Sequence, residues 1–160
     1  MPDGKALISG LAEKQGQTDF KRLHWEGSFA DYLDLVMQKP AVVRTAFKRV
    51  YDMIMSYGAV DFTEHKEKLV HFKFFDDPDH GGQDAIFGID KSLMNLVHLF
   101  RAAAQGYGVE RRVLLLHGPV GSSKSTLARL LKKGLEAYSR KEEGALYSFS
   151  WNTKDKGGAI

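Results

Sequence analysis

One stretch of this sequence has the residue types and spacing needed to hold a phosphate chain. It covers residues 118–125 and reads GPVGSSKS. The usual phosphate-binding pattern is G-x-x-x-x-G-K-[ST], and every fixed position matches except that Ser123 replaces the second glycine. Gly118 and Gly121 let the backbone turn tightly, so the N–H groups between Val120 and Ser125 can converge on anionic oxygens. The stretch therefore predicts a phosphate-binding loop of the Walker A type.

The side chains at the end of this loop have distinct expected roles. Lys124, the predicted catalytic residue, would bridge the β- and γ-phosphates of ATP, and the hydroxyl of Ser125 would bind Mg²⁺. Thr126 is placed to touch the α-phosphate. The simpler alternative is a turn rich in glycine and serine, with a helix-capping serine and a surface lysine. We predict that ATP is held by Gly118, Pro119, Val120, Gly121, Ser122, Ser123, Lys124, Ser125 and Thr126.

A loop of this kind needs a strand before it and a helix after it. Residues 113–117 form a short continuous apolar run, typical of a strand buried on both faces of a parallel sheet. Apolar spacing predicts a helix from about residue 124 to 138, although Gly134 inside it costs roughly 1 kcal/mol relative to alanine. A second strand is predicted over residues 146–151. Strand, loop, helix and strand together predict a βαβ unit.

Two helices and two strands are predicted upstream of the loop. Ser28, with an acidic residue three positions on, is a capping signal for a first helix that Pro40 ends. A second helix is predicted over residues 41–57, with Gly58 as its C-terminal cap. Both helices are read as packed amphipathic elements, with partner binding as the alternative. Strands are predicted over residues 60–62 and 68–75.

A polar turn and a third helix follow these strands. Residues 76–82 carry three carboxylates and His80, which could indicate a metal, but Pro78 and two glycines favour a polar loop. The strand at residues 69–75 and the aspartates after it also faintly resemble a magnesium-positioning strand. Such a strand usually follows the phosphate loop, whereas this one precedes it. Asp90 is a good N-cap for a helix predicted from Lys91 to about residue 105.

The overall composition narrows the classes of protein. The length of 160 residues suits one domain, alone or with an extension. The absence of cysteine excludes disulfides and thiolate metal sites and fits a cytoplasmic protein. The net charge of +3 is spread along the chain, which favours a mixed-charge surface over a nucleic-acid interface. No apolar run approaches the roughly 20 residues that span a bilayer, so no membrane association is expected.

Three stretches together resemble the N-terminal AAA region of the PrkA family, bacterial proteins named as serine protein kinases. They are residues 24–33 (HWEGSFADYL), residues 85–90 (AIFGID) and the phosphate loop. The resemblance runs from about Phe20 to Trp151. It implies that Ile86, Phe87 and Gly88 form the turn placed against the adenine ring, for which a hydrophobic turn before a helix is the alternative. It also implies homo-oligomers with nucleotide at the subunit interfaces.

The resemblance further implies an incomplete enzyme. Family members continue with a Walker B Asp-Glu, a sensor residue, an arginine finger and a C-terminal domain, none of which these 160 residues contain. We therefore expect an α/β fold, a truncated P-loop core of the AAA type with a parallel sheet, preceded by an N-terminal helical segment. The expected organisation is a flexible lead-in at 1–24, a helical segment with a short hairpin at 25–82, and the start of the AAA core at 83–160.

The expected function is ATP binding with little turnover by this chain. As a longer protein it would be an ATP-dependent serine protein kinase or ATPase, a transferase whose protein substrate the sequence does not identify. The V-A-I-K, H-R-D and D-F-G motifs of eukaryotic-type kinases are absent. The alternative is a nucleotide-dependent assembly or regulatory module without catalytic activity of its own.

Overall fold

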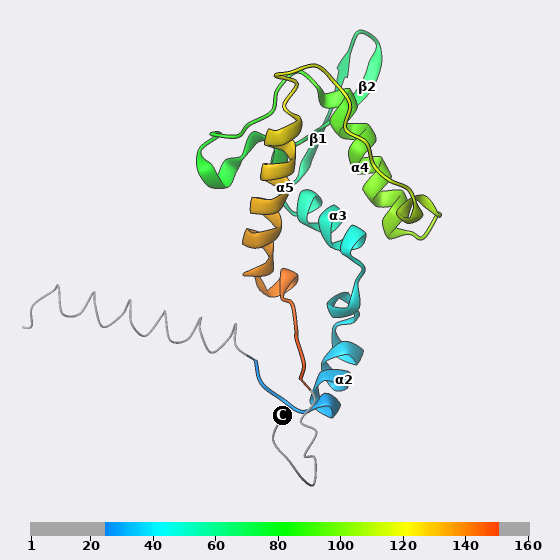
Figure 1. The fold of residues 1–160 in the computed structure, drawn as a ribbon, viewed down its shortest axis with the longest axis vertical. Coiled ribbons are helices and arrows are strands. Elements are labelled where there is room, and N and C mark those ends of the chain that lie inside the picture. Colours follow the sequence, from blue (N-terminus) through cyan, green and yellow to red (C-terminus); the bar gives the residue numbers. More distant parts are fainter. Residues whose placement is uncertain (1–24, 151–160) are drawn as a thin grey trace, which may run out of the picture.

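The computed structural model describes residues 25–150 (Figure 1). The predicted lead-in at 1–24 and the end of the chain from Trp151 lie outside the described residues. In chain order the main elements are α2 (Phe29–Gln38), α3 (Ala46–Ser56), β1 (Ala59–Glu64), β2 (Glu67–Phe72), α4 (Asp90–Ala104) and α5 (Lys124–Ser139). Within this part of the chain, none of the helices has the length and apolar character needed to cross a membrane.

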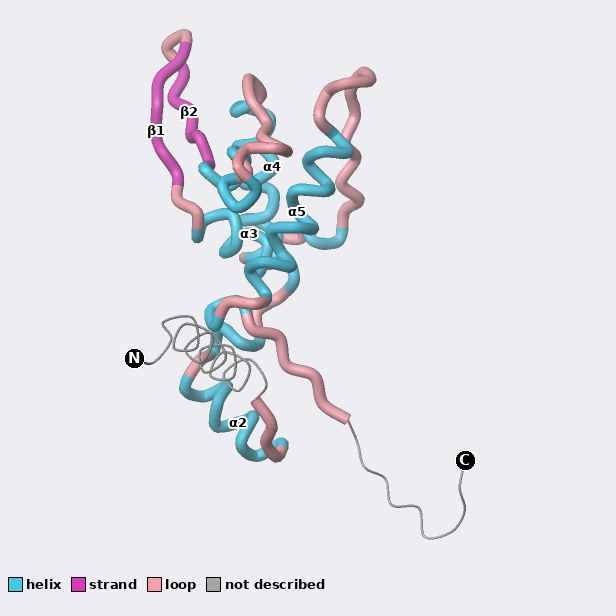
Figure 2. Tube along the Cα trace, turned by 90° about the vertical axis from the view of Figure 1, so that its left-hand side faces the viewer, coloured by secondary structure: helices cyan, strands magenta, loops and turns pink. Residues whose placement is uncertain are grey.

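Helix α2 begins with the predicted cap. The Ser28 hydroxyl accepts a hydrogen bond from the Asp31 N–H at 3.2 Å, and the Asp31 carboxylate accepts one from the Ser28 N–H at 2.7 Å. This reciprocal pair is a capping box. None of the residues in α2 is buried, and the helix lies away from the other helices, as both views show (Figures 1 and 2).

The helix predicted over residues 41–57 is interrupted. A 3-10 turn at Pro40–Val43 is followed by α3, which begins only at Ala46. Thr45 has an extended backbone, and its side chain accepts a hydrogen bond from the Lys48 N–H at 3.3 Å. Thr45 therefore caps a new helix instead of continuing an old one. Gly58 has φ +88 and donates to the Met55 carbonyl at 3.0 Å, which confirms the predicted C-terminal glycine.

The two predicted strands form an antiparallel hairpin. β1 and β2 pair from Ala59 opposite Phe72 to Glu64 opposite Glu67. The second strand ends earlier than predicted, because Lys73–Asp76 forms a 3-10 turn. That turn lets the consecutive residues Phe74 and Phe75 both enter the core, at 2% and 0% exposure. A strand would have pointed them to opposite faces.

One hydrophobic core joins most of these elements. It lies between α3, β2, α4 and α5 and includes the side chain of Ile86. Residues on both sides of the boundary expected between 82 and 83 contribute to this core, and the boundary itself stays a prediction. Gly134 of α5 has a packing role there, since a Cβ on it would lie 2.4 Å from a ring carbon of Phe74. The core residues are Met53, Ile54, Phe72, Phe74, Phe75, Ile86, Leu93, Leu96, Val97, Phe100, Leu127, Leu130 and Tyr138.

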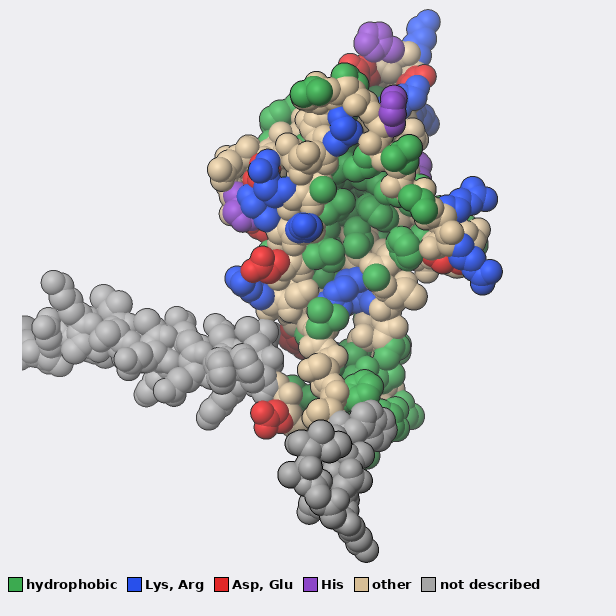
Figure 3. Space-filling model, viewed as in Figure 1, with side chains coloured by type: hydrophobic (Ala, Val, Ile, Leu, Met, Phe, Trp, Pro, Cys, Tyr) green, Lys and Arg blue, Asp and Glu red, His purple; other side chains and the backbone are tan. Residues whose placement is uncertain are grey.

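The prediction of a parallel sheet is wrong for the described residues. Between residues 25 and 150, the sheet is the antiparallel β1–β2 pair, and residues 113–117 and 146–150 form no strand. Val113 and Leu115 are 94% and 79% exposed, and apolar side chains gather on the face shown in Figure 3. The physical reason is that a strand is completed by hydrogen bonds to neighbouring strands, and these two segments pair neither with each other nor with the hairpin.

Candidate phosphate-binding site

The loop before α5 folds into a tight turn around its own backbone. Gly121 has φ +85, a conformation that favours glycine. The Ser122 hydroxyl donates to the Pro119 carbonyl at 2.8 Å, and the Ser122 N–H donates to the same oxygen at 3.4 Å. A Cβ on Gly118 would lie 2.8 Å from the Ser122 hydroxyl oxygen. Gly121 is therefore required by its conformation, whereas a side chain at Gly118 would displace the Ser122 hydroxyl from its place in the turn.

The ammonium group of Lys124 lies inside this turn. Its Nζ donates to the carbonyls of Gly118 at 2.8 Å and Pro119 at 2.6 Å, and lies 2.8 Å from the Ser122 hydroxyl. These three oxygens occupy the directions in which an ammonium can donate. The loop is thus closed around a positive charge, and its own oxygens take up the hydrogen bonds of the ammonium.

The start of α5 adds further donors for an anion. Ser123, the N-cap residue, has left-handed dihedrals (φ 56, ψ 13), and its side chain makes no capping hydrogen bond. The N–H groups of Lys124, Ser125 and Thr126 have no acceptor within the helix, because the first turn of any α-helix lacks them. The helix dipole also favours negative charge at this end. The side chain of Ser125 is exposed beside these groups.

The three residues expected against adenine lie in different environments. Ile86 is 2% exposed, belongs to the core, and its N–H donates to the Phe75 carbonyl at 2.9 Å. Phe87 is 76% exposed. Gly88 has φ +75 with open space where a Cβ would be, so this glycine serves the turn and not a close approach. Of the two apolar side chains, Phe87 is the exposed one and Ile86 the buried one.

The turn also borders a groove on the hairpin side. Gly88 and the following residues line a groove of about 670 Å³ together with Phe62 and Leu69. Residues of the phosphate loop do not line this groove. The structure therefore brings the predicted phosphate residues together as one loop and places the predicted base-binding turn beside the hairpin.

A buried acidic residue next to this turn was missed by the sequence analysis. Asp84 has a side chain only 8% exposed, paired with Arg129 Nη2 at 2.9 Å and Lys133 Nζ at 2.6 Å. The hydrogen bond from Lys133, aided by the charge of Arg129, lowers the pKa of the Asp84 carboxyl against the effect of burial. Both cations belong to α5. Their spacing of four residues on one helix face is the only trace of this contact in the sequence.

A second missed cluster surrounds a histidine of β2. Nε2 of His71 lies 3.0 Å from an Asp76 carboxylate oxygen, and Nδ1 lies 2.7 Å from one of Asp90. These hydrogen bonds, to Asp76 first and Asp90 second, raise the pKa of His71. Asp90 was predicted as the N-cap of the third helix, but α4 begins at Asp90 itself, with Ile89 at the cap.

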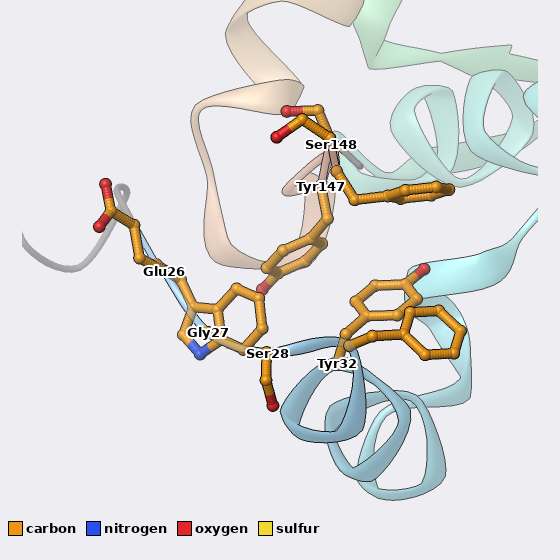
Figure 4. Close-up of a pocket in the computed structure, with 10 residues that line it drawn as sticks. Glu26, Gly27, Ser28, Tyr32, Tyr147 and Ser148 are labelled. Carbon is orange, nitrogen blue, oxygen red and sulfur yellow. The ribbon is translucent and has the colours of Figure 1, made fainter. Parts of the chain in front are cut away.

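An aromatic pocket lies at the other end of the molecule. The start of α2 and residues 147–150 line a pocket of about 490 Å³, in which the rings of Tyr32 and Tyr147 lie 5.9 Å apart between centroids and are tilted by 55° (Figure 4). Tyr147 also meets the ring of Trp25 edge-on at a centroid distance of 5.5 Å. The stretch at residues 24–33, one of the three that carried the family resemblance, thus supplies a helix cap and an aromatic contact.

Residues 118–126 thus form one loop that leads into the first turn of α5, with the ammonium of Lys124 inside it. The family model described as the PrkA AAA domain matches residues 27–152, and the chain belongs to this family. Membership of an AAA family implies the P-loop NTPase fold.

Two curated proteins show how the chain relates to longer and shorter relatives. It is 42% identical over 129 residues to the ATP-dependent protease PrkA of Bacillus subtilis (strain 168), covering 80% of this chain and 19% of that protein. It is 36% identical over 94 residues to an uncharacterized protein in the gldA 5′ region of Geobacillus stearothermophilus, covering 58% of this chain and 86% of that protein. No solved structure matches the chain.

Proposed function

We propose that the chain binds ATP together with Mg²⁺ through residues 118–126. The observation that carries this proposal is the closed loop around the Lys124 ammonium at the uncapped start of α5. A helix N-terminus preceded by a glycine-containing loop is a ready site for phosphate groups. Lys124 adds a full positive charge within that site.

Binding would exchange one set of oxygens for another. In the structure described here, Lys124 is held by two carbonyls of its own loop. A triphosphate would take over these bonds, and charge-assisted bonds to phosphate are stronger than those to neutral carbonyls. The free N–H groups of the first helical turn would bind the neighbouring phosphate oxygens. The exposed Ser125 hydroxyl would bind Mg²⁺, which supplies charge neutralisation on the phosphates.

The base would rest on the turn that follows Asp84. Phe87 offers an exposed aromatic ring there, and an aromatic ring can stack on a purine. Ile86 supports the turn from the core rather than touching the base.

The activity of longer family members is a separate proposal. The chain spans 19% of the length of the Bacillus subtilis relative, which is named as an ATP-dependent protease. The family resemblance instead implied a serine protein kinase. Both activities would draw on the same ATP site. We expect this chain to turn ATP over slowly, because its sequence after the loop contains no Asp-Glu pair to position Mg²⁺ and water.

A second candidate function is nucleotide-dependent assembly. The apolar residues Val113 and Leu115, and Met37 of α2, are strongly exposed, and exposed apolar patches commonly mark protein interfaces. Light scattering with and without ATP separates the two candidates. Oligomers that form only when ATP is present favour nucleotide-dependent assembly, and a chain that binds ATP as a monomer favours ATP binding alone. We propose the cytoplasm as the setting for either function.

A thermal-shift experiment tests the ATP proposal. At a ligand concentration of about 100 times Kd, binding stabilises the folded state by about 2.7 kcal/mol. The wild-type chain should therefore melt at a higher temperature with Mg-ATP than without it, and Lys124→Ala should lose the shift. Robust ATP hydrolysis that Lys124→Ala abolishes would contradict the expectation of slow turnover.

A further inference from the structure

The segment before the base-binding turn is held by two buried carboxylates. Asp77 is 2% exposed and has a left-handed φ of 51. One of its carboxylate oxygens accepts the Asp84 N–H at 2.9 Å, and the other lies 2.8 Å from Nδ1 of His80. Its main-chain carbonyl accepts the Gly82 N–H at 2.9 Å. Asp77 therefore fixes the backbone of the loop that leads to Asp84.

Asp84 connects this loop to α5. Its two carboxylate oxygens point to different cations, Arg129 on one side and Lys133 on the other. A buried carboxylate is stable only when it is paired in this way. The connection joins parts of the chain that are 45 and 49 residues apart (129 minus 84, and 133 minus 84).

The same helix begins with the phosphate-binding lysine. Arg129 follows Lys124 by five residues, a rise of about 7.5 Å along a helix. On the other side of the ion pairs, Ala85 donates to the Gly82 carbonyl at 3.1 Å and Ile86 donates to Phe75 at 2.9 Å. The phosphate loop leads directly into α5, and the turn at residues 86–88 is linked to the same helix by the Asp84 ion pairs in addition to the core packing of Ile86.

We propose that Asp84 is a positioning residue that holds the base-binding turn at a fixed place relative to the phosphate loop, through its ion pairs with Arg129 and Lys133. The proposal rests on the ATP-binding function proposed above. Asp84 does not touch the nucleotide. It sets where Phe87 lies when the phosphates are bound, and a supporting contact of this kind decides the geometry of a site.

The test separates the base from the phosphates. Asp84→Asn should weaken binding of Mg-ATP by about fivefold or more, the lower end of typical coupling between sites. Binding of inorganic tripolyphosphate should stay within about twofold of wild type, because it does not use the turn. Calorimetric titration measures both. Asp79→Asn removes the same charge from the same loop, at a carboxylate that accepts a hydrogen bond from the Tyr57 hydroxyl and not from a cation of α5, and should change neither affinity.

A second pair of variants approaches the contact from α5. Lys133→Gln should reproduce the selective loss of ATP affinity, and Lys132→Gln, its exposed neighbour, should not. Equal losses for ATP and tripolyphosphate, or no loss for either, in Asp84→Asn and Lys133→Gln would overturn the proposal.

Hydrogen exchange distinguishes failure of this proposal from failure of the ATP proposal. In Asp84→Asn, amides of residues 85–88 should exchange faster while those of α4 are unchanged, with or without nucleotide. If the wild-type chain binds no ATP, the ATP proposal fails and the positioning role fails with it. Faster exchange at the turn would still show that the Asp84 ion pairs hold the turn in place. Unchanged exchange would contradict the claim that the Asp84 ion pairs hold the turn in place.

Discussion

Helices α2 and α5 both follow a serine, yet their first turns differ. Ser28 is extended and accepts a hydrogen bond from Asp31 in a capping box. Ser123 is left-handed and makes no capping hydrogen bond. A helix start that is satisfied by its own side chains leaves fewer N–H groups for a ligand. A serine at the N-cap position thus accepts a hydrogen bond from the first turn of α2, whereas the serine at the same position of α5 leaves the N–H groups of the first turn available to an anion.

The two helices also differ in what their apolar faces contact. In α5 the face is buried, with Leu127, Leu130, Gly134 and Tyr138 in the interior. In α2 the residues Phe29, Leu33 and Met37 are 56%, 47% and 81% exposed. Both helices have apolar residues at helical spacing. The pattern therefore identifies the apolar face, and the packing partners decide whether it is buried.

The largest expected difference comes from matched truncations on these faces. Leu130→Ala should destabilise the chain by about 2–5 kcal/mol, because it leaves a cavity at a residue only 2% exposed. Leu33→Ala in α2 should cost less than about 1 kcal/mol. Urea unfolding of each variant measures the free energies. Equal losses would show that α2 is packed as tightly as α5.

A smaller effect is expected at the close contact of α5 with the core. Gly134→Ala gains helix propensity, but the added methyl group meets Phe74 and the sulfur of Met53. Overpacking of this kind costs about 1–3 kcal/mol, which outweighs the roughly 1 kcal/mol of propensity. Thermal unfolding should therefore show a lower Tm. Lys132→Ala on the exposed side of α5 is the control, and a higher Tm for Gly134→Ala would contradict the packing described here.

The two serines themselves should respond in opposite directions. Ser28→Ala removes a capping bond worth about 1 kcal/mol to its helix, and exchange of the α2 amides should become faster. Ser123→Gly removes the cost of a left-handed side chain, about 1 kcal/mol, and should raise the Tm. A lower Tm for Ser123→Gly would mean that the serine side chain contributes a contact to the loop.

The start of α4 is a third helix start, and its contact with a histidine should make stability depend on pH. Asp90 at the start of α4 is bonded to His71, which also contacts Asp76. Because the folded state raises the pKa of His71, its stabilisation is complete below about pH 6.5, the unfolded value, and is lost as pH rises through the higher folded value. The midpoint of urea unfolding should therefore fall over that range.

The size of this fall is the smallest effect predicted here, because His71 is partly exposed. His71→Gln should flatten the dependence, whereas His98→Gln, on the exposed side of α4, should leave it unchanged. A steep dependence that survives in His71→Gln would assign the effect to another group.

Local signals in the sequence were enough to predict the helices and the loop. Capping at Ser28, the glycine after α3 and the apolar spacing of α4 and α5 act over a few residues, so they are visible without the fold. The start of α3 is the exception. The apolar pattern is continuous from residue 41, but the structure shows that Thr45 caps a helix beginning at Ala46.

The parts that could not be predicted depend on distant contacts. Residues 113–117 have a strand composition, but a strand exists only with neighbours. Asp84 and its two cations are brought together by the packing of α5, and the four-residue spacing of the cations does not identify their partner. The sequence shows that Gly134 lowers the helix propensity of α5. It does not show why a glycine is needed there, which is the close approach of the Phe74 ring.

The central claim is that the first turn of α5 and the ammonium of Lys124 bind the phosphates of ATP. Calorimetric titration of Mg-ATP into the wild-type chain, Lys124→Ala and Ser123→Gly tests it most directly. We expect measurable heat of Mg-ATP binding for wild type and Ser123→Gly and none for Lys124→Ala, with all three chains folded. Heat of equal size in Lys124→Ala, or none in the folded wild-type chain, would contradict it.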